Sequence, residues 1–396
     1  MADQPTSPYP AVEQLIDKYL GPGTLPGAVV SIGRGASRAP DYVARGTIAF
    51  DSARPADESA LWRAYSLTKP VTGILVMILI GEGKLTLDTP VSEFIPGFAK
   101  TRILTSPETS LDSMPGRNVM TVRHLLTHTA GLGYNLISKG PLLEELKRLG
   151  VMPRKLSRAD DAPVHRAPDL AAFADRLATL PLVAEPGTWW SYSVGLEIAG
   201  RVTEVVEGKS FDLVMKDKLF DPLGMADSFF QVPAARAGDL STTYEIVDGK
   251  PVPYDPGATS TFLDRPDILS GGVGLVCSAH DYDRYLAMLA GWGTLDGVQL
   301  MPEETARLAM SDILPETVDR RSMLIPGGFG AGGRVSIAGP DKGSFGWFGA
   351  AGTAATVDPI RGLRAGGWVQ FMPSTALGFP QEVVAAVTAD AVDAVA

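Results

Sequence analysis

Cysteine is nearly absent from this sequence: Cys277 is the single one among 396 residues. One cysteine cannot close a disulfide within the chain, so a fold held together by disulfide bonds is excluded. Its neighbours are small or apolar, with Gly274-Leu275-Val276 before it and Ser278 after it. This setting favours a buried Cys277 that packs as a small apolar residue over a reactive thiol.

Long apolar runs and an excess of positive charge are missing as well. No stretch approaches the roughly 18–20 apolar residues of a membrane-spanning helix, and residues 1–8 lack the basic and apolar regions of a secretory signal. The formal net charge is −10, and no block of lysine and arginine offsets it. We therefore expect a cytoplasmic protein with neither a membrane nor a nucleic acid as partner.

The composition that remains is globular, 45% hydrophobic and 20% charged. The length suits two or three average domains, or one larger enzyme with an inserted subdomain. A predicted helix at 11–20 is followed by predicted strands at 26–33 and 42–50 and by an apolar helix at 71–80. This order favours an antiparallel sheet with helices against it over a doubly wound parallel sheet.

The rest of the chain continues this pattern. Residues 97–120 and 141–167 are expected to be loops, and the second is either a solvated, partly helical connection or the border of a substrate cleft. The middle of the chain shows helical patterns at 121–128, 169–180, 196–206, 211–220 and 282–289. The C-terminal third predicts strands at 344–353, 354–359 and 363–372 and a closing helix at 381–395.

Ser66 and Lys69 stand three residues apart, directly before the apolar helix at 71–80. Positions i and i+3 share one face of a helix, so a lysine amine could lie against the serine hydroxyl. Pro70 fits a helix only in its first turn. Ser66 would therefore lie at or just before the helix start, where the dipole favours developing negative charge. This position suits a nucleophile. A pattern as short as Ser-x-x-Lys also occurs by chance, however, and the alternative is a surface serine and lysine at a helix start.

Two other signals do not lead to a metal or phosphate site. His124 and His128 have a spacing that can chelate zinc, but no glutamate follows His124 and no third ligand is evident. We therefore expect histidines that pack or form hydrogen bonds, and no metal. The glycine-rich stretch 328–333 lacks the following lysine and helix of a phosphate loop.

Three motifs follow one another along the chain: Ser-x-x-Lys at 66–69, Tyr-Ser-Val at 192–194 and Trp-Phe-Gly at 347–349. Their order resembles that of the serine β-lactamase and penicillin-binding-protein superfamily, among whose motifs is Ser-x-x-Lys. Three further stretches are similar to those of class C β-lactamases and their esterase relatives: 124–132, 220–225 and 270–275.

Two departures point away from antibiotic hydrolysis. Val194 stands where class C enzymes carry the asparagine of Tyr-x-Asn, and residues 347–349 replace Lys-Thr-Gly, which removes a cation that attracts the antibiotic's carboxylate. Family VIII carboxylesterases are more similar, with a Tyr-Ser-aliphatic motif and a Trp-x-Gly third motif. They commonly carry Trp-Gly-Gly, so Phe348 is a further departure that would narrow the cleft. The chain has no Gly-x-Ser-x-Gly elbow, which argues against an α/β-hydrolase.

The resemblance implies an α+β fold of the β-lactamase type. An antiparallel sheet would be flanked by helices, and a mostly helical subdomain would be inserted into it. We expect residues 1–85 and 285–396 to form the sheet domain and residues 86–284 the inserted domain. The cleft would lie between the two, with Ser66 at its floor.

The resemblance also implies roles for individual residues. Ser66 would attack an ester carbonyl, and Lys69 and Tyr192 would share the transfer of its proton. The side chains of unperturbed lysine and tyrosine have pKa values of about 10, so the pKa of each would have to shift for it to act as a base. The backbone N–H groups of Ser66 and Ala350 would form the oxyanion hole. No metal or organic cofactor is required. The residues expected to contact substrate are Tyr65, Val194, Trp347, Phe348 and Gly349, with packing under the sheet edge as the alternative for Phe348.

The expected function is hydrolysis of small-molecule carboxylic esters with short acyl chains. Three alternatives stay open: an acyltransferase that uses the same acyl-enzyme, a β-lactamase or D-Ala peptidase, and a non-catalytic binding protein. The last would be expected to lose Ser66, Lys69 or Tyr192, and all three are present. The sequence does not distinguish a monomer from a dimer.

Overall fold

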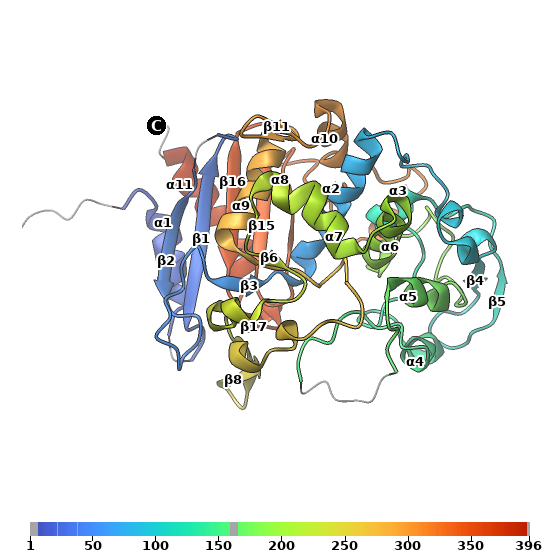
Figure 1. Ribbon diagram of the computed structural model, residues 1–396, viewed down its shortest axis with the longest axis horizontal. Helices are drawn as coiled ribbons and strands as arrows, with labels where there is room; N and C mark the ends of the chain where they lie inside the picture. Colours follow the sequence, from blue (N-terminus) through green and yellow to red (C-terminus); the bar gives the residue numbers. More distant parts are fainter. Residues whose placement is uncertain (1–6, 22, 38, 159–164, 394–396) are drawn as a thin grey trace, which may run out of the picture.

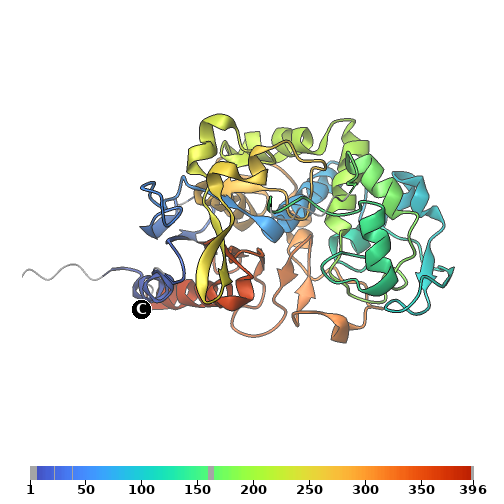
Figure 2. The same ribbon diagram turned by 90° about the horizontal axis from the view of Figure 1, so that it is seen from below.

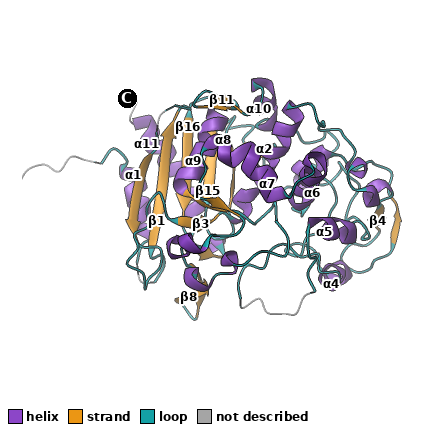
Figure 3. Cartoon of the chain, in the orientation of Figure 1, coloured by secondary structure: helices purple, strands orange, loops and turns teal. Residues whose placement is uncertain are grey.

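A seven-stranded antiparallel sheet forms one side of the molecule (Figures 1 and 3). The structure is a computed structural model that describes residues 7–21, 23–37, 39–158 and 165–393. Across the sheet the order is β12 (Gly328–Phe329), β13 (Arg334–Val335), β14 (Phe345–Phe348), β15 (Ala354–Asp358), β16 (Leu363–Trp368), β1 (Gly27–Arg34) and β2 (Asp41–Gly46). Strands from the two ends of the chain therefore pair directly, with Val29 opposite Trp368.

Helices cover both faces of this sheet. α1 (Pro10–Tyr19) and α11 (Phe379–Asp393) lie side by side on one face, and α9 (Ala279–Ala290) packs on the other (Figures 1 and 2). β1 accordingly alternates, with Ala28, Val30 and Ile32 in the cluster beneath the terminal helices and Val29 in the main core. A strand buried on both faces must be apolar throughout, which is why 26–33 reads as a nearly continuous apolar run.

The helix predicted at 71–80 is α2 (Thr68–Gly81), and it lies in the centre of the molecule. Every residue from Thr68 to Leu79 is buried, as expected of a helix that is apolar all round. Pro70 is its third residue, which confirms the prediction that this proline lies in the first turn. α6 (Gly195–Glu207) and α10 (Glu303–Ala309) pack along α2.

The chain between α2 and α9 combines helices with long loops, and small sheets connect it to the rest (Figure 3). Its other helices are α3 (Val122–Leu126), α4 (Gly140–Arg148), α5 (Leu170–Leu177), α7 (Phe211–Met215) and α8 (Asp221–Leu223). One small sheet joins β3 (Leu61–Arg63), β9 (Val276–Ser278) and β6 (Ser228–Phe229), and another joins β17 (Phe371–Met372), β7 (Thr243–Val247) and β8 (Lys250–Asp255). Two hairpins complete the set, β4 (Arg102–Leu104) with β5 (Ser113–Pro115) and β10 (Thr294–Leu295) with β11 (Val298–Gln299).

The structure corrects several predicted elements. Residues 97–120, expected as a loop, contain the β4–β5 hairpin, and the strand expected at 344–353 ends at Phe348. The excursion at 141–167 begins with α4, while its residues 159–164 lie outside the described residues. The domain division at residues 85 and 285 stays a prediction. No helix in the described ranges has the length and apolarity needed to cross a bilayer.

A buried ion pair fastens α9 to the sheet. Arg364 on β16 donates from Nε and Nη2 to the two carboxylate oxygens of Asp283 on α9, at 3.0 and 2.9 Å. The two side chains are 0% and 3% exposed. Because both charges are desolvated, the pair adds little net stability, but removal of one partner leaves an uncompensated charge in the core.

We therefore expect Asp283→Ala to lower the free energy of unfolding by about 3–5 kcal/mol. Urea denaturation followed by circular dichroism would measure this change. Glu144→Ala serves as the control because it breaks the exposed Lys147–Glu144 pair, for which we expect a change below about 1 kcal/mol. Equal effects from the two substitutions would contradict the assigned role of the buried pair.

Candidate active site

Ser66 lies in a single 3₁₀ turn, Tyr65–Leu67, directly before α2. The preceding Tyr65 has a φ of 47°, a left-handed conformation that is unfavourable for an aromatic residue. Hydrogen bonds hold this turn, because Thr68 Oγ1 donates to the Tyr65 carbonyl at 2.6 Å and the Leu275 N–H donates to Thr68 Oγ1 at 3.1 Å. Ser66 remains 8% exposed at this point, so its hydroxyl lies at the edge of the core.

The structure brings together the three residues that the sequence singled out. Lys69 Nζ lies 3.2 Å from Ser66 Oγ, and the Tyr192 hydroxyl lies 2.8 Å from the same oxygen. Lys69 Nζ also donates to the Gly272 carbonyl at 2.9 Å and lies 4.6 Å from the centre of the Tyr192 ring. Trp347 Nε1 donates to the Tyr192 hydroxyl at 3.3 Å. One serine oxygen thus faces two groups that can exchange a proton with it.

Tyr192 is positioned by His128, which sequence reasoning assigned only to packing or hydrogen bonding. The Ser193 N–H donates to His128 Nδ1 at 3.2 Å, and the Ser191 N–H donates to the His128 carbonyl at 2.9 Å. His128 Nδ1 is therefore an acceptor, and Nε2 carries the ring proton. Complete burial lowers the pKa of His128 well below its usual range, and the charge of Lys69 lowers it further. His128 is accordingly a neutral support whose ring lies 4.7 Å from that of Tyr192.

The end of β14 lies against the residue that precedes the nucleophile turn. A Cβ added to Gly349 would collide with the Ala64 carbonyl and the Thr353 hydroxyl, so only glycine permits this approach. Thr353 Oγ1 donates to the same Ala64 carbonyl at 3.2 Å. The N–H of Ala350 follows directly and donates no hydrogen bond within the described ranges. The oxyanion-hole role of Ser66 and Ala350 stays a prediction.

The residues predicted to contact substrate lie in different surroundings. Trp347 is 8% exposed and lies beside Tyr192, whereas Phe348 packs against the cluster beneath the terminal helices. Successive strand residues point to opposite faces, which agrees with the packing alternative for Phe348, and its role stays a prediction. Tyr65 and Val194 are 0% and 1% exposed. A contact of either side chain with substrate stays a prediction.

Sequence reasoning missed Tyr134, which borders the same group. Its ring centre lies 5.7 Å from that of Tyr192 and 6.0 Å from Lys69 Nζ. Burial raises the pKa of Tyr134 well above its usual range, and Tyr192 and Glu197 raise it further, so its hydroxyl stays protonated. The only sequence signal was its position two residues after the stretch 124–132, which the resemblance had already marked.

The two histidines that had a metal-ligand spacing have separate protein partners. His124 Nδ1 accepts the N–H of Thr121 at 3.1 Å, at the start of α3. Burial lowers the pKa of His124 to about 4, and the neighbouring Arg123 adds to this shift. Within the part of the chain that the structure describes, no three His, Cys, Asp or Glu side chains are grouped to hold a metal ion.

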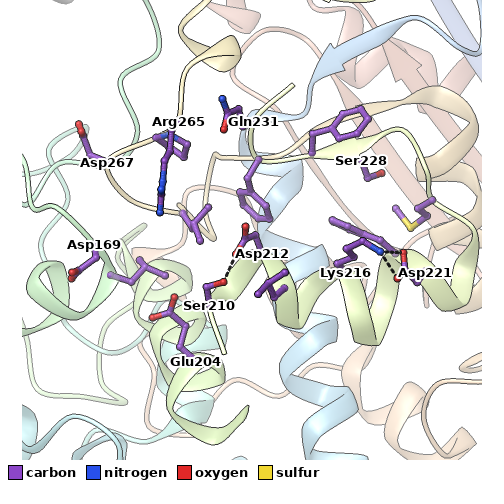
Figure 4. Close-up of a pocket in the computed structure, with 18 of the residues that line it drawn as sticks. Asp169, Glu204, Ser210, Asp212, Lys216, Asp221, Ser228, Gln231, Arg265 and Asp267 are labelled. Atoms are coloured by element: carbon purple, nitrogen blue, oxygen red, sulfur yellow. Dashed lines mark hydrogen bonds and ion pairs between the residues drawn. The ribbon is translucent and has the colours of Figure 1, made fainter. Parts of the chain in front are cut away.

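A cavity of about 820 Å³ lies apart from this site, against α5, α6 and α7 (Figure 4). Its lining mixes polar and apolar side chains and includes an ion pair between Lys216 and Asp221 and a hydrogen bond of 2.6 Å from Ser210 to Asp212. Ser66, Lys69 and Tyr192 do not line it. We assign no function to this cavity.

Comparison with known proteins places this arrangement in a family context. The family model described as Beta-lactamase matches residues 12–389. Protein Rv1367c of Mycobacterium tuberculosis is 32% identical over 330 residues, which cover 79% of this chain and 78% of that protein. Esterase EstB of Burkholderia gladioli is 32% identical over 285 residues, 68% of this chain and 66% of EstB. The solved structure of EstCE1, a hydrolase with promiscuous acyltransferase activity, matches with a TM-score of 0.78 and 25% identity, over 95% of this chain and 97% of EstCE1.

The lowered pKa of His124 predicts how stability depends on pH. The unfolded histidine gains a proton below about pH 6.5, whereas the folded one stays neutral down to about pH 4. His124 therefore contributes stability that is full above about pH 6.5 and is lost as the pH falls toward about 4, by at most about 1.4 kcal/mol per pH unit. In His124→Gln, the free energy of unfolding should therefore depend less steeply on pH between about pH 6.5 and 4. We expect the slope to fall by at most about 1.4 kcal/mol per pH unit. Urea denaturation at several pH values would measure it.

His280→Gln is the control of opposite sign. A hydrogen bond to Asp281 raises the pKa of His280, so the charge of this histidine stabilises the protein below about pH 6.5. Without the His280 charge, the free energy of unfolding should fall more steeply as the pH is lowered. The effect should be slight because the side chain is half exposed. A profile that is unchanged by His124→Gln would contradict the inferred neutral state.

Proposed function

This chain belongs to the β-lactamase family, and we propose that it is a serine carboxylesterase that cleaves small-molecule esters through an acyl-enzyme on Ser66. Its relatives identify it as a serine hydrolase. The observation that carries the finer proposal is the position of Ser66 Oγ, 3.2 Å from Lys69 Nζ and 2.8 Å from the Tyr192 hydroxyl. A hydroxyl within hydrogen-bond reach of two proton acceptors is the arrangement that activates a serine nucleophile.

The proposed reaction has two halves. Ser66 Oγ attacks the ester carbonyl, its proton passes to the Lys69–Tyr192 pair, and the carbonyl oxygen takes the negative charge. The backbone N–H groups of Ser66 and Ala350 would stabilise that oxygen. The tetrahedral intermediate then expels the alcohol, which receives the proton from the same pair. A water molecule repeats these steps on the acyl-enzyme, releases the carboxylic acid and restores Ser66.

Lys69 and Tyr192 act as one unit in this proposal because each is held by a further contact. The Gly272 carbonyl fixes the lysine amine at 2.9 Å. Trp347 Nε1 donates to the tyrosine oxygen at 3.3 Å, and this bond strengthens when that oxygen gains negative charge. Tyr192 therefore delivers the proton at a fixed point beside the nucleophile.

The surroundings of Ser66 favour a neutral ester over an anionic lactam. The side chains beside Tyr192 include two uncharged aromatic ones, Tyr134 and Trp347. Trp347 occupies the position at which lactamases carry the lysine of Lys-Thr-Gly. A carboxylate-bearing antibiotic would therefore lose a charge partner on entering the site. We propose esters with short acyl chains as the substrates.

A second candidate is acyl transfer to an alcohol. It is favoured by the similarity to EstCE1, which is described as a hydrolase with promiscuous acyltransferase activity. Both reactions pass through the same acyl-enzyme and differ only in whether water or an alcohol attacks it. Adding 1-butanol to a p-nitrophenyl butyrate assay and measuring butyl butyrate against butyric acid by gas chromatography would separate them.

We expect wild-type protein to hydrolyse p-nitrophenyl acetate and butyrate faster than octanoate, with little opening of a chromogenic cephalosporin. Ser66→Ala should reduce ester turnover by about 10³-fold or more. Ser110→Ala, in the β4–β5 hairpin, is the matched control and should leave it unchanged. Ester turnover that survives Ser66→Ala would refute the mechanism, and efficient cephalosporin hydrolysis would favour the lactamase alternative.

The hydrogen bond from Trp347 can be tested separately. Trp347→Phe keeps an aromatic ring but removes the N–H donor to Tyr192, so we expect kcat/KM to fall about 3- to 10-fold. Trp189→Phe is the matched control, since this side chain is 45% exposed. Similar losses in both variants would show that the N–H of Trp347 has no special role.

A further inference from the structure

A buried carboxylate lies behind the proposed catalytic lysine. Glu197 is in the first turn of α6 and is 1% exposed. Its Oε1 accepts hydrogen bonds from Ser270 Oγ at 2.6 Å and from the Gly272 N–H at 3.2 Å. No lysine or arginine in the described ranges forms an ion pair with it. A buried carboxylate without a cation is costly unless something else supports it.

Gly272 connects this carboxylate to Lys69. Its N–H donates to Glu197, and its carbonyl accepts from Lys69 Nζ at 2.9 Å. A Cβ at this position would collide with the Glu197 carboxylate and would have to displace it. Thr72 Oγ1 donates to the neighbouring Gly271 carbonyl at 2.7 Å. Residues 270–272 are therefore held between α2 on one side and α6 on the other.

Of the other titratable groups that face Lys69, Tyr134 and His128 carry no negative charge. Tyr192 and Tyr134 lie with their ring centres 4.6 and 6.0 Å from its Nζ, and Tyr134 stays protonated. His128 is neutral, because burial and the neighbouring Lys69 both lower its pKa. Among the described residues, Glu197 is the carboxylate that lies on the Gly272 side of Lys69. One residue, Gly272, separates this carboxylate from the lysine ammonium.

We propose that Glu197 is a positioning residue for catalysis, which holds Lys69 through Gly272 and balances its positive charge. This inference rests on the proposed function, because Glu197 can position a catalytic residue only if Ser66, Lys69 and Tyr192 form the catalytic group. A negative charge on the far side of Gly272 favours the protonated form of the group. The ascending limb of the pH–rate profile reports the loss of that proton, so Glu197 sets the pH at which the enzyme becomes active.

Glu197→Gln keeps an oxygen acceptor for Ser270 and Gly272 but removes the charge. We expect the ascending limb to move to lower pH by about one unit, because the proton leaves more easily without the nearby carboxylate. The readout is the rate at which a p-nitrophenyl alkylphosphonate modifies Ser66, followed by p-nitrophenol release and mass spectrometry from pH 5 to 10. The same limb is measured in p-nitrophenyl butyrate hydrolysis.

Two further variants separate charge from geometry. Glu197→Asp keeps the charge but shortens the side chain, so it should slow modification while its limb stays at the wild-type pH. Glu204→Gln makes the same substitution two turns further along α6, where the carboxylate pairs with Arg201, and should leave the limb unmoved. An unshifted limb in Glu197→Gln, or equal shifts in all three variants, would overturn the inference. Wild-type protein that is not modified at Ser66 would overturn the proposed function as well.

Discussion

The proposed catalytic group depends on the complete burial of one helix start. α2 is surrounded on all sides, so the turn before it cannot move without disturbing the core. That rigidity holds Tyr65 in a left-handed conformation and leaves Ser66 at the surface of the core while Lys69 is 1% exposed. Lys69 can be buried because the Gly272 carbonyl, the serine oxygen and an aromatic ring receive its ammonium group.

The parts of the site that are local in sequence could be predicted, and those set by distant contacts could not. Helix geometry alone predicts that Lys69 lies against Ser66 and that Pro70 lies in the first turn. Tyr192, 126 residues from Ser66, was found by the order of motifs and by no physical pattern. That Tyr65 and Val194 are buried could not be predicted, because a residue beside a motif can point either way.

The same limit applies to charge. Sequence composition cannot indicate that the carboxylate of Glu197 lies behind Lys69, since one is on α6 and the other on α2 and residues 270–272 join them. His128 offered a metal-ligand spacing with His124, yet the fold turns each ring toward a different backbone N–H. The predicted sheet and its terminal helices were easier, because periodic apolar patterns report which faces are buried.

The pairing of β1 with β16 has a consequence for biosynthesis. β1 is among the first strands to leave the ribosome, but its partner on one side, with Trp368 opposite Val29, is translated near the end. Until then an apolar strand edge stays open to other chains, which makes a nascent or truncated product prone to aggregation. Folding of the sheet is therefore a late event, and a chaperone that shields β1 during translation would raise the yield of native protein.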